Sequence, residues 1–96
     1  MMFNRKLHST CLHGRRVGAD AYGGSVFEPP RKLRCRREDV RRMVLDGNGR
    51  EVVSSSRYFL TEAVAPGDTL DGLTVLSVAA VTSMFGRIEG YEASCA

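Results

Sequence analysis

Two tight turns within residues 65–78, Ala-Pro-Gly-Asp-Thr-Leu-Asp-Gly-Leu-Thr-Val-Leu-Ser-Val, constrain the fold of this chain more than any other stretch. Proline followed by glycine at 66–67 favours a type II turn, since proline presets φ and glycine accepts the positive φ needed next. Asp71-Gly72 suits the type I′ turn of a two-residue hairpin. Two reversals so close together predict antiparallel β-structure. Apolar or small side chains on both alternating sets of positions in 73–81 predict a strand covered on both faces in a barrel wall.

Length and composition set the outer bounds. The chain has 96 residues, of which 43% are hydrophobic, and fits a single domain that gains stability from a partner. No apolar run approaches the roughly 20 residues that span a bilayer, and no apolar block follows Arg5 and Lys6 as in a secretory signal. We expect no membrane contact and folding in the cytoplasm.

The remaining turn and strand signals predict a single all-β domain over 1–96, a small antiparallel β-barrel of SH3 or OB size. Residues 1–17 form a weakly structured N-terminal arm with a weak strand in 7–17, and residues 18–25 form a glycine-rich loop. In the predicted strand at 32–36, the side chains of Leu33 and Cys35 point inward and the basic side chains between them point outward. Asp-Gly-Asn-Gly at 46–49 predicts an extended hairpin over 38–60, whose serine run at 54–56 offers no apolar contact and therefore extends beyond the barrel. A turn at 84–87 leads into the last strand. The predicted core comprises Leu33, Cys35, Phe59, Leu70, Val75, Leu76, Val78 and Tyr91.

Cysteine, histidine and glycine patterns argue against an enzyme. Cys11, Cys35 and Cys95 cannot all pair within one chain, and we expect them to be reduced. His8 and His13 point to opposite faces of a strand, so with Cys11 they make a poor zinc site. The glycine-rich loop lacks the Gly-Lys-Ser/Thr ending of a phosphate-binding loop, and no pattern places a base near the serines. We predict no catalytic residue, no cofactor and no metal.

Charge is distributed unevenly along the chain. Residues 1–50 carry 12 Lys/Arg and 5 Asp/Glu, whereas residues 51–96 carry 2 and 6, so a segment of charge +7 precedes one of charge −4. The basic residues are densest in 31–42. Such a run is commonly a solvated strand face, and otherwise a surface that meets phosphates or an acidic neighbour.

The order of these motifs carries a resemblance to a known family. Seven short motifs follow one another along the chain: Asp-Ala-Tyr-Gly at 20–23, Cys-Arg at 35–36, Asp-Gly-Asn-Gly-Arg-Glu-Val-Val-Ser-Ser at 46–55, Pro-Gly-Asp at 66–68, Asp-Gly at 71–72, Thr-Val-Leu-Ser-Val at 74–78 and Gly-Arg-Ile-Glu-Gly-Tyr-Glu at 86–92. This pattern, over residues 20–95, resembles the head-closure or head-to-tail stopper proteins of tailed bacteriophages. Gly90 departs from the family, which more often has a larger polar residue there, and it predicts a bulge in the last strand.

The resemblance implies a ring homo-oligomer in the virion, below the portal and adaptor proteins and above the tail terminator or other tail proteins. Such a ring closes the channel around packaged double-stranded DNA, which it contacts without sequence specificity. We place the 38–60 hairpin at the lumen, with these candidate residues: Arg41, Arg42, Asn48, Arg50, Ser54, Ser55, Ser56 and Arg57. The predicted subunit interface joins a basic edge to an acidic one through these residues: Arg34, Arg36, Arg37, Glu62, Asp68, Asp71, Glu89 and Glu92.

Two other readings stay open. A small basic SH3-like or OB-like module could hold nucleic acid with the basic half of the chain, although such modules usually display exposed aromatic rings for stacking. A small scaffold or regulator without a nucleic-acid role is the third. Assembly into a ring separates the first reading from both alternatives.

Overall fold

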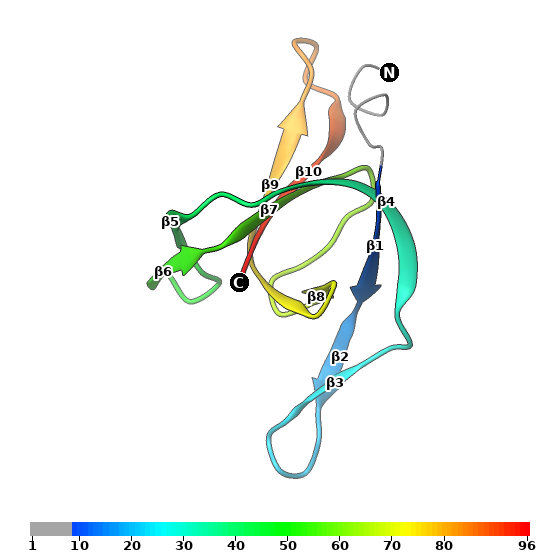
Figure 1. Ribbon diagram of the computed structural model, residues 1–96, viewed down its shortest axis with the longest axis vertical. Coiled ribbons are helices and arrows are strands. Elements are labelled where there is room, and N and C mark those ends of the chain that lie inside the picture. Colours follow the sequence, from blue (N-terminus) through cyan, green and yellow to red (C-terminus); the bar gives the residue numbers. More distant parts are fainter. Residues whose placement is uncertain (1–8) are drawn as a thin grey trace.

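The computed structural model describes residues 9–96 and shows an all-β protein (Figure 1). Its strands are β1 (Ser9–Gly14), β2 (Arg16–Ala19), β3 (Ser25–Phe27), β4 (Arg31–Glu38), β5 (Arg42–Leu45), β6 (Glu51–Ser54), β7 (Ser56–Leu60), β8 (Thr69–Leu70), β9 (Leu73–Thr82) and β10 (Ile88–Cys95). Six of them close into a barrel in the order β1-β4-β7-β10-β9-β8, and all the pairings are antiparallel. The predicted small antiparallel barrel is confirmed.

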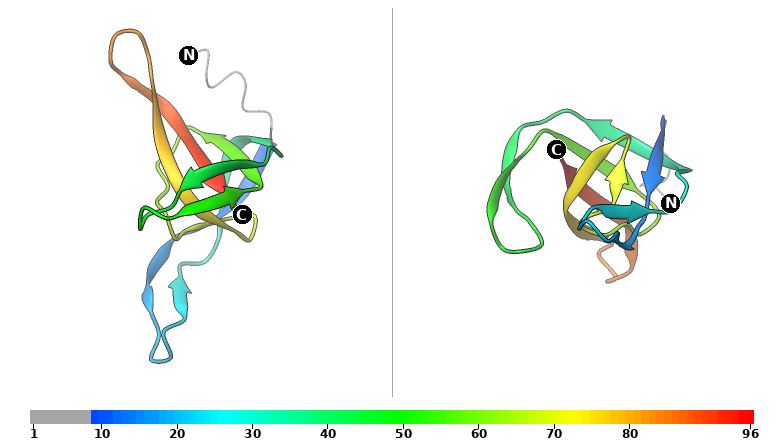
Figure 2. Two further views of the ribbon diagram at one scale, coloured as in Figure 1. Left: turned by 90° about the vertical axis from the view of Figure 1, so that its left-hand side faces the viewer. Right: turned by 90° about the horizontal axis from the view of Figure 1, so that it is seen from below.

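Three β-hairpins project from the barrel in different directions (Figures 1 and 2). β2 and β3 form one two-stranded sheet, β5 and β6 form a second, and the far ends of β9 and β10 form the third. In Figure 1 the β2–β3 hairpin points down, the β9–β10 hairpin points up and the β5–β6 hairpin lies to the side. The β2–β3 hairpin was not predicted. Residues 18–25 were expected to form only a loop, but they include parts of β2 and β3, and residues 7–17 hold β1 and the start of β2 in place of one weak strand.

The predicted turns form as their chemistry requires. Asp71 and Gly72 have φ of 52° and 82° and join Leu70 to its partner Leu73. Gly67 has φ of 96°, and Asp68 N donates to Ala65 O at 3.1 Å across the Pro66-Gly67 turn. The predicted bulge at Gly90 is also present, as a register shift between Ile88 and Gly90.

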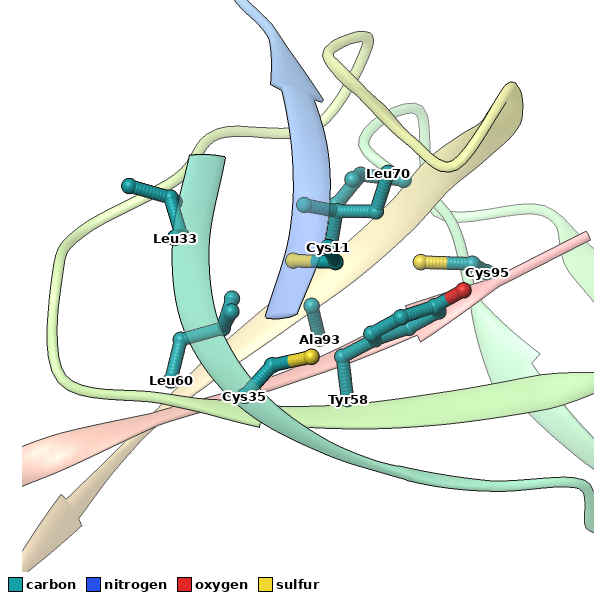
Figure 3. Close-up of a cluster of buried hydrophobic side chains, with 9 residues drawn as sticks. Cys11, Leu33, Cys35, Tyr58, Leu60, Leu70, Ala93 and Cys95 are labelled. Carbon is teal, nitrogen blue, oxygen red and sulfur yellow. The ribbon is translucent and has the colours of Figure 1, made fainter. Parts of the chain in front are cut away.

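Alternating side chains of five strands and Leu70 of β8 fill the barrel (Figure 3). The core comprises Cys11, Leu33, Cys35, Tyr58, Leu60, Leu70, Val75, Ala93 and Cys95. Four predicted members, Leu33, Cys35, Leu70 and Val75, are confirmed, and Val78 is half-buried against this cluster. The prediction of Phe59, Leu76 and Tyr91 as core residues was wrong. β7 turns Tyr58 and Leu60 inward, β9 buries only Val75, and Tyr91 of β10 is half-buried. The expectation that β9 is covered on both faces is therefore also wrong.

The serine run lies where the β5–β6 hairpin meets the barrel, with Ser54 at the end of β6 and Ser56 at the start of β7. Ser54 and Ser56 are buried, and Ser54 Oγ lies within hydrogen-bonding distance of both Ser56 O and Cys95 O. Ser55 N donates to Cys95 O at 2.9 Å. Burial of a hydroxyl is tolerated when it is hydrogen-bonded. The prediction that this run extends beyond the barrel was therefore wrong, and only residues 42–54 form the hairpin.

Candidate interaction surfaces

A charged network covers the outer face of β4, β7 and β10. The strand register sets Arg36 beside Phe59 and Phe59 beside Glu92. The guanidinium groups of Arg36 and Arg57 lie over the Phe59 ring, 4.9 and 5.2 Å from its centroid. Glu38 accepts hydrogen bonds from both arginines, and that from Arg57 is the main reason that the pKa of this carboxyl lies below its usual value. The arginines are thus engaged within one chain.

Arg42 fastens the β5–β6 hairpin to the barrel. Its Nη2 lies 2.6 Å from Glu92 Oε1 and 3.0 Å from Ser94 Oγ. Glu92 also meets Arg57 at 3.5 Å, so one carboxylate on β10 joins the hairpin to β7. Together with buried Ser54, this contact fixes the base of the hairpin.

The tip of the same hairpin is exposed and internally ordered. Asp46 Oδ1 accepts hydrogen bonds from Asn48 N at 2.8 Å and Arg50 N at 3.0 Å, and these bonds lower the pKa of Asp46, with the bond from Arg50 the larger cause. Gly49 supplies the positive φ of the turn at 77°. Of the candidate lumen residues, Arg41, Asn48 and Arg50 are exposed. Neither of these two arginines has an ion-pair partner among residues 9–96. Arg42 and Arg57 are ion-paired, and Ser54 and Ser56 are buried.

Several predicted interface residues are engaged inside the protomer. Asp68 is 3% exposed, which corrects its assignment to an exposed acidic surface. Asp71 accepts hydrogen bonds from Leu12 N at 2.8 Å and from the Tyr58 hydroxyl at 3.0 Å. Arg37 pairs with Asp39 at 2.8 Å, and Glu62 pairs with Arg31 at 3.1 Å. The outer face therefore balances most of its own charge, a pattern that the sequence did not predict.

Asp68 has a structural partner in His13. His13 Nε2 lies 2.9 Å from Asp68 Oδ2, and both side chains are almost fully buried. Asp68 also accepts from Arg16 N and Ala65 N. Burial raises the pKa of Asp68, but the three hydrogen bonds outweigh it and leave that pKa below the usual value. The residue organises the turn at 65–68 and ties it to β1.

Exposed apolar side chains gather on the hairpins. Tyr22, at the tip of β2–β3, is 97% exposed, and Met84 and Phe85, at the tip of β9–β10, are 91% and 85% exposed. Met43 and Leu45 of β5 are more than half exposed. Sequence reasoning missed these tips, although apolar residues at turn positions, where polar ones are usual, were the available signal.

The described residues hold no metal-binding cluster of three or more His, Cys, Asp or Glu; His8, one of the residues considered for zinc, lies outside them. Burial is the main reason that the pKa of all three thiols is raised, for Cys95 to about 12. Such thiols are poor nucleophiles.

Between residues 9 and 96, no helix could cross a membrane.

Comparison with known proteins adds no identification. No family model matches the chain, and no curated protein or solved structure proves similar to it. The fold alone defines the class, a small all-β protein with a closed antiparallel barrel and projecting hairpins.

Proposed function

We propose that this chain is a structural subunit of the head-to-tail connector of a tailed bacteriophage. In this proposal it forms a ring below the portal, closes the DNA channel after packaging and offers the surface to which the tail attaches. The observation that carries the proposal is the arrangement of three hairpins with exposed apolar side chains around one small barrel. The order of turn motifs along residues 20–95 supports it.

A connector subunit needs contacts above, below and beside it. The β9–β10 tip, which carries Met84 and Phe85, lies at one end of the molecule, and the β2–β3 tip, which carries Tyr22, lies at the opposite end (Figures 1 and 2). Large exposed apolar side chains of this kind are typical anchors of protein interfaces. The ion pairs on the outer face join residues of the same protomer and are partly exposed, so they add little to the contacts between subunits.

The β5–β6 hairpin is the part of the chain best suited to face DNA. Arg50 at its tip and Arg41 at its base are exposed cations, separated by β5 and by a turn with two glycines and Asn48. Two cations attract phosphates without reading bases, and they bind DNA less tightly than a continuous basic surface. A channel that must hold DNA and later release it needs such weak contacts.

The nucleic-acid-binding module is less well supported. Phe59, the aromatic ring on the outer face, is covered by Arg36 and Arg57. Tyr22 and Phe85, the most exposed rings among residues 9–96, belong to the β2–β3 and β9–β10 tips at opposite ends of the molecule, so they share no surface on which successive bases could stack.

Retention of DNA in packaged heads tests the proposal. Heads are completed with the wild-type chain, with an Arg41→Ser/Arg50→Ser variant, or with a Lys32→Ser/Arg87→Ser control that removes the same charge elsewhere, and then treated with nuclease. We expect the wild type and the control to protect packaged DNA, and the Arg41/Arg50 variant to protect less. Equal protection by both variants would refute the lumenal role of the hairpin, and equal protection without the chain would refute the connector function.

A further inference from the structure

One edge of the barrel strand β9 is open. β8 pairs only with Leu73 and Thr74, and the turn at 65–68 bonds to Val75. Beyond that point, β9 continues to Thr82 with β10 hydrogen-bonded on one side and, among residues 9–96, no strand hydrogen-bonded on the other. The tip of the β5–β6 hairpin lies near the start of this edge, at residues 74–76. An open edge offers backbone groups to another strand.

The hydrogen-bond pattern identifies the open groups. Ser55 N donates to Cys95 O, so the backbone groups of Cys95 face β7 and those of Ser94 face β9. Ser77, the partner of Ser94, therefore faces β10. Backbone groups alternate between the two sides of a strand, so the N–H and C=O groups that face away from β10 are those of Val78, Ala80 and Thr82.

The side chains of this segment offer no protection against pairing. Residues 73–84 contain no charged residue, no proline and no glycine. Natural edge strands are usually blocked by charge, proline or a bulge. Ala79, Ala80 and Thr82 are exposed, so no bulky side chain covers the middle of the edge.

We infer that two copies of this chain pair through their β9 edges, antiparallel and related by a two-fold axis at Ala80. In this register Ala80 lies opposite Ala80 of the second copy, and Val78 lies opposite Thr82. Every open group acquires a partner, because the three residues that face outward pair only with one another. Only Ala80 meets its own copy in this register, and the lack of charge in 73–84 means that no like charges meet across the paired strands.

The same register covers the apolar tip of the β9–β10 hairpin. Met84 and Phe85 lie in the turn that follows Thr82, and antiparallel pairing brings this turn beside the residues that precede Val78 in the second copy. Val75 and Leu76 there line a pocket of about 350 Å³ together with the turn at 66–67 and the β5–β6 tip at 46–48. Two-fold pairing therefore brings the exposed apolar tip of each copy close to a pocket on the other, which favours a second copy as the occupant of the edge.

This inference goes beyond the proposed function and does not rest on it. A two-fold dimer is a closed assembly and cannot extend into a ring. The dimer is therefore a state of the free protein, in which the open edge and the β9–β10 tips are covered before any assembly.

The test measures molar mass by sedimentation equilibrium over a range of concentrations, for the wild type, Ala80→Lys, Ala80→Glu and an equal mixture of the two variants. We expect a concentration-dependent dimer for the wild type, monomers for each variant alone and a heterodimer in the mixture, since only the mixture sets opposite charges face to face. Ala21→Lys, at an exposed alanine on the β2–β3 tip, serves as the charge control and should dimerise as the wild type does. Circular dichroism checks that all variants keep the fold.

Three outcomes would overturn the inference. These are a wild type that stays monomeric at its highest soluble concentration, a dimer that survives in both Ala80 variants separately, and a mixture that does not associate. A wild-type ring of higher order, unaffected by the Ala80 variants, would also overturn it while leaving the proposed function standing.

Discussion

His13 Nε2 lies 2.9 Å from Asp68 Oδ2, and this contact joins β1 to the turn that precedes β8. Because an ionised carboxylate only accepts hydrogen bonds, Nε2 carries the proton. Asp68 completes its bonding with Arg16 N and Ala65 N. The pair therefore helps to hold the short strand β8 beside β1, where the barrel closes.

Replacing Asp68 with Asn should destabilise the protein by about 1–3 kcal/mol, since His13 and two backbone N–H groups lose a charged acceptor. The folded-state pKa of Asp68 is lowered, so its contribution is fully present above the unfolded value of about 3.9 and is lost as the pH falls through the lower, folded value. Urea unfolding at neutral and acidic pH measures the free energy of unfolding of the wild type and of the variant. The wild type should lose more stability on acidification than Asp68→Asn does.

Glu51→Gln, at an exposed carboxyl, is the matched control and should follow the wild type at each pH. An Asp68→Asn variant with wild-type stability at neutral pH would contradict the structural role of the pair.

Replacing Tyr58 with Phe should cost about 0.5–1.5 kcal/mol, because its hydroxyl donates to Asp71 Oδ2 at 3.0 Å from an otherwise apolar core. Burial, and then Asp71, raise the pKa of this phenol, so it should stay protonated in alkali until the barrel unfolds. Thermal unfolding and ultraviolet titration measure the two effects. Tyr22→Phe, at an exposed ring, should change neither the stability nor that delayed titration step.

All three thiols should react with a water-soluble disulfide reagent only when the barrel opens. Cys11, Cys35 and Cys95 are buried, and burial is the main reason that their pKa values are raised. Labelling should therefore be slow in buffer and complete in urea. Rapid labelling of any thiol in the native protein would show that the core is more open than described.

Replacing Arg42 with Ala should release the β5–β6 hairpin without unfolding the barrel. Arg42 links this hairpin to Glu92 and Ser94, but the pair is partly exposed, so the expected cost is about 1 kcal/mol or less. Hydrogen exchange should become faster at residues 42–54 and stay unchanged in β4 and β7. Arg41→Ala, the neighbouring exposed arginine, should leave both regions as they are.

Local chemistry made the turns predictable, whereas the position of the core depended on long-range pairing. The Asp71-Gly72 and Pro66-Gly67 signals needed only the φ preferences of their own residues. Tyr58 and Phe59 have similar strand propensity, so the sequence could not decide which of them points inward. Pairing of β7 with β4 and β10 decides it.

The charged surface was predicted only in part for the same reason. The uneven charge along the chain suggested contacts between protomers, but folding brings Arg42 to Glu92, residues 50 positions apart, within the same chain. The serine run likewise looked exposed, and its burial depends on hydrogen bonds to Cys95 at the far end of the sequence.

Electron microscopy of this chain mixed with the portal complex encoded in the same genome tests the connector proposal most directly. We predict a ring of added density, coaxial with the portal, that narrows the channel and is lost or weakened when Phe85 and Tyr22 are both replaced with Ser. A portal that stays bare with the folded wild-type chain in excess would contradict the proposal.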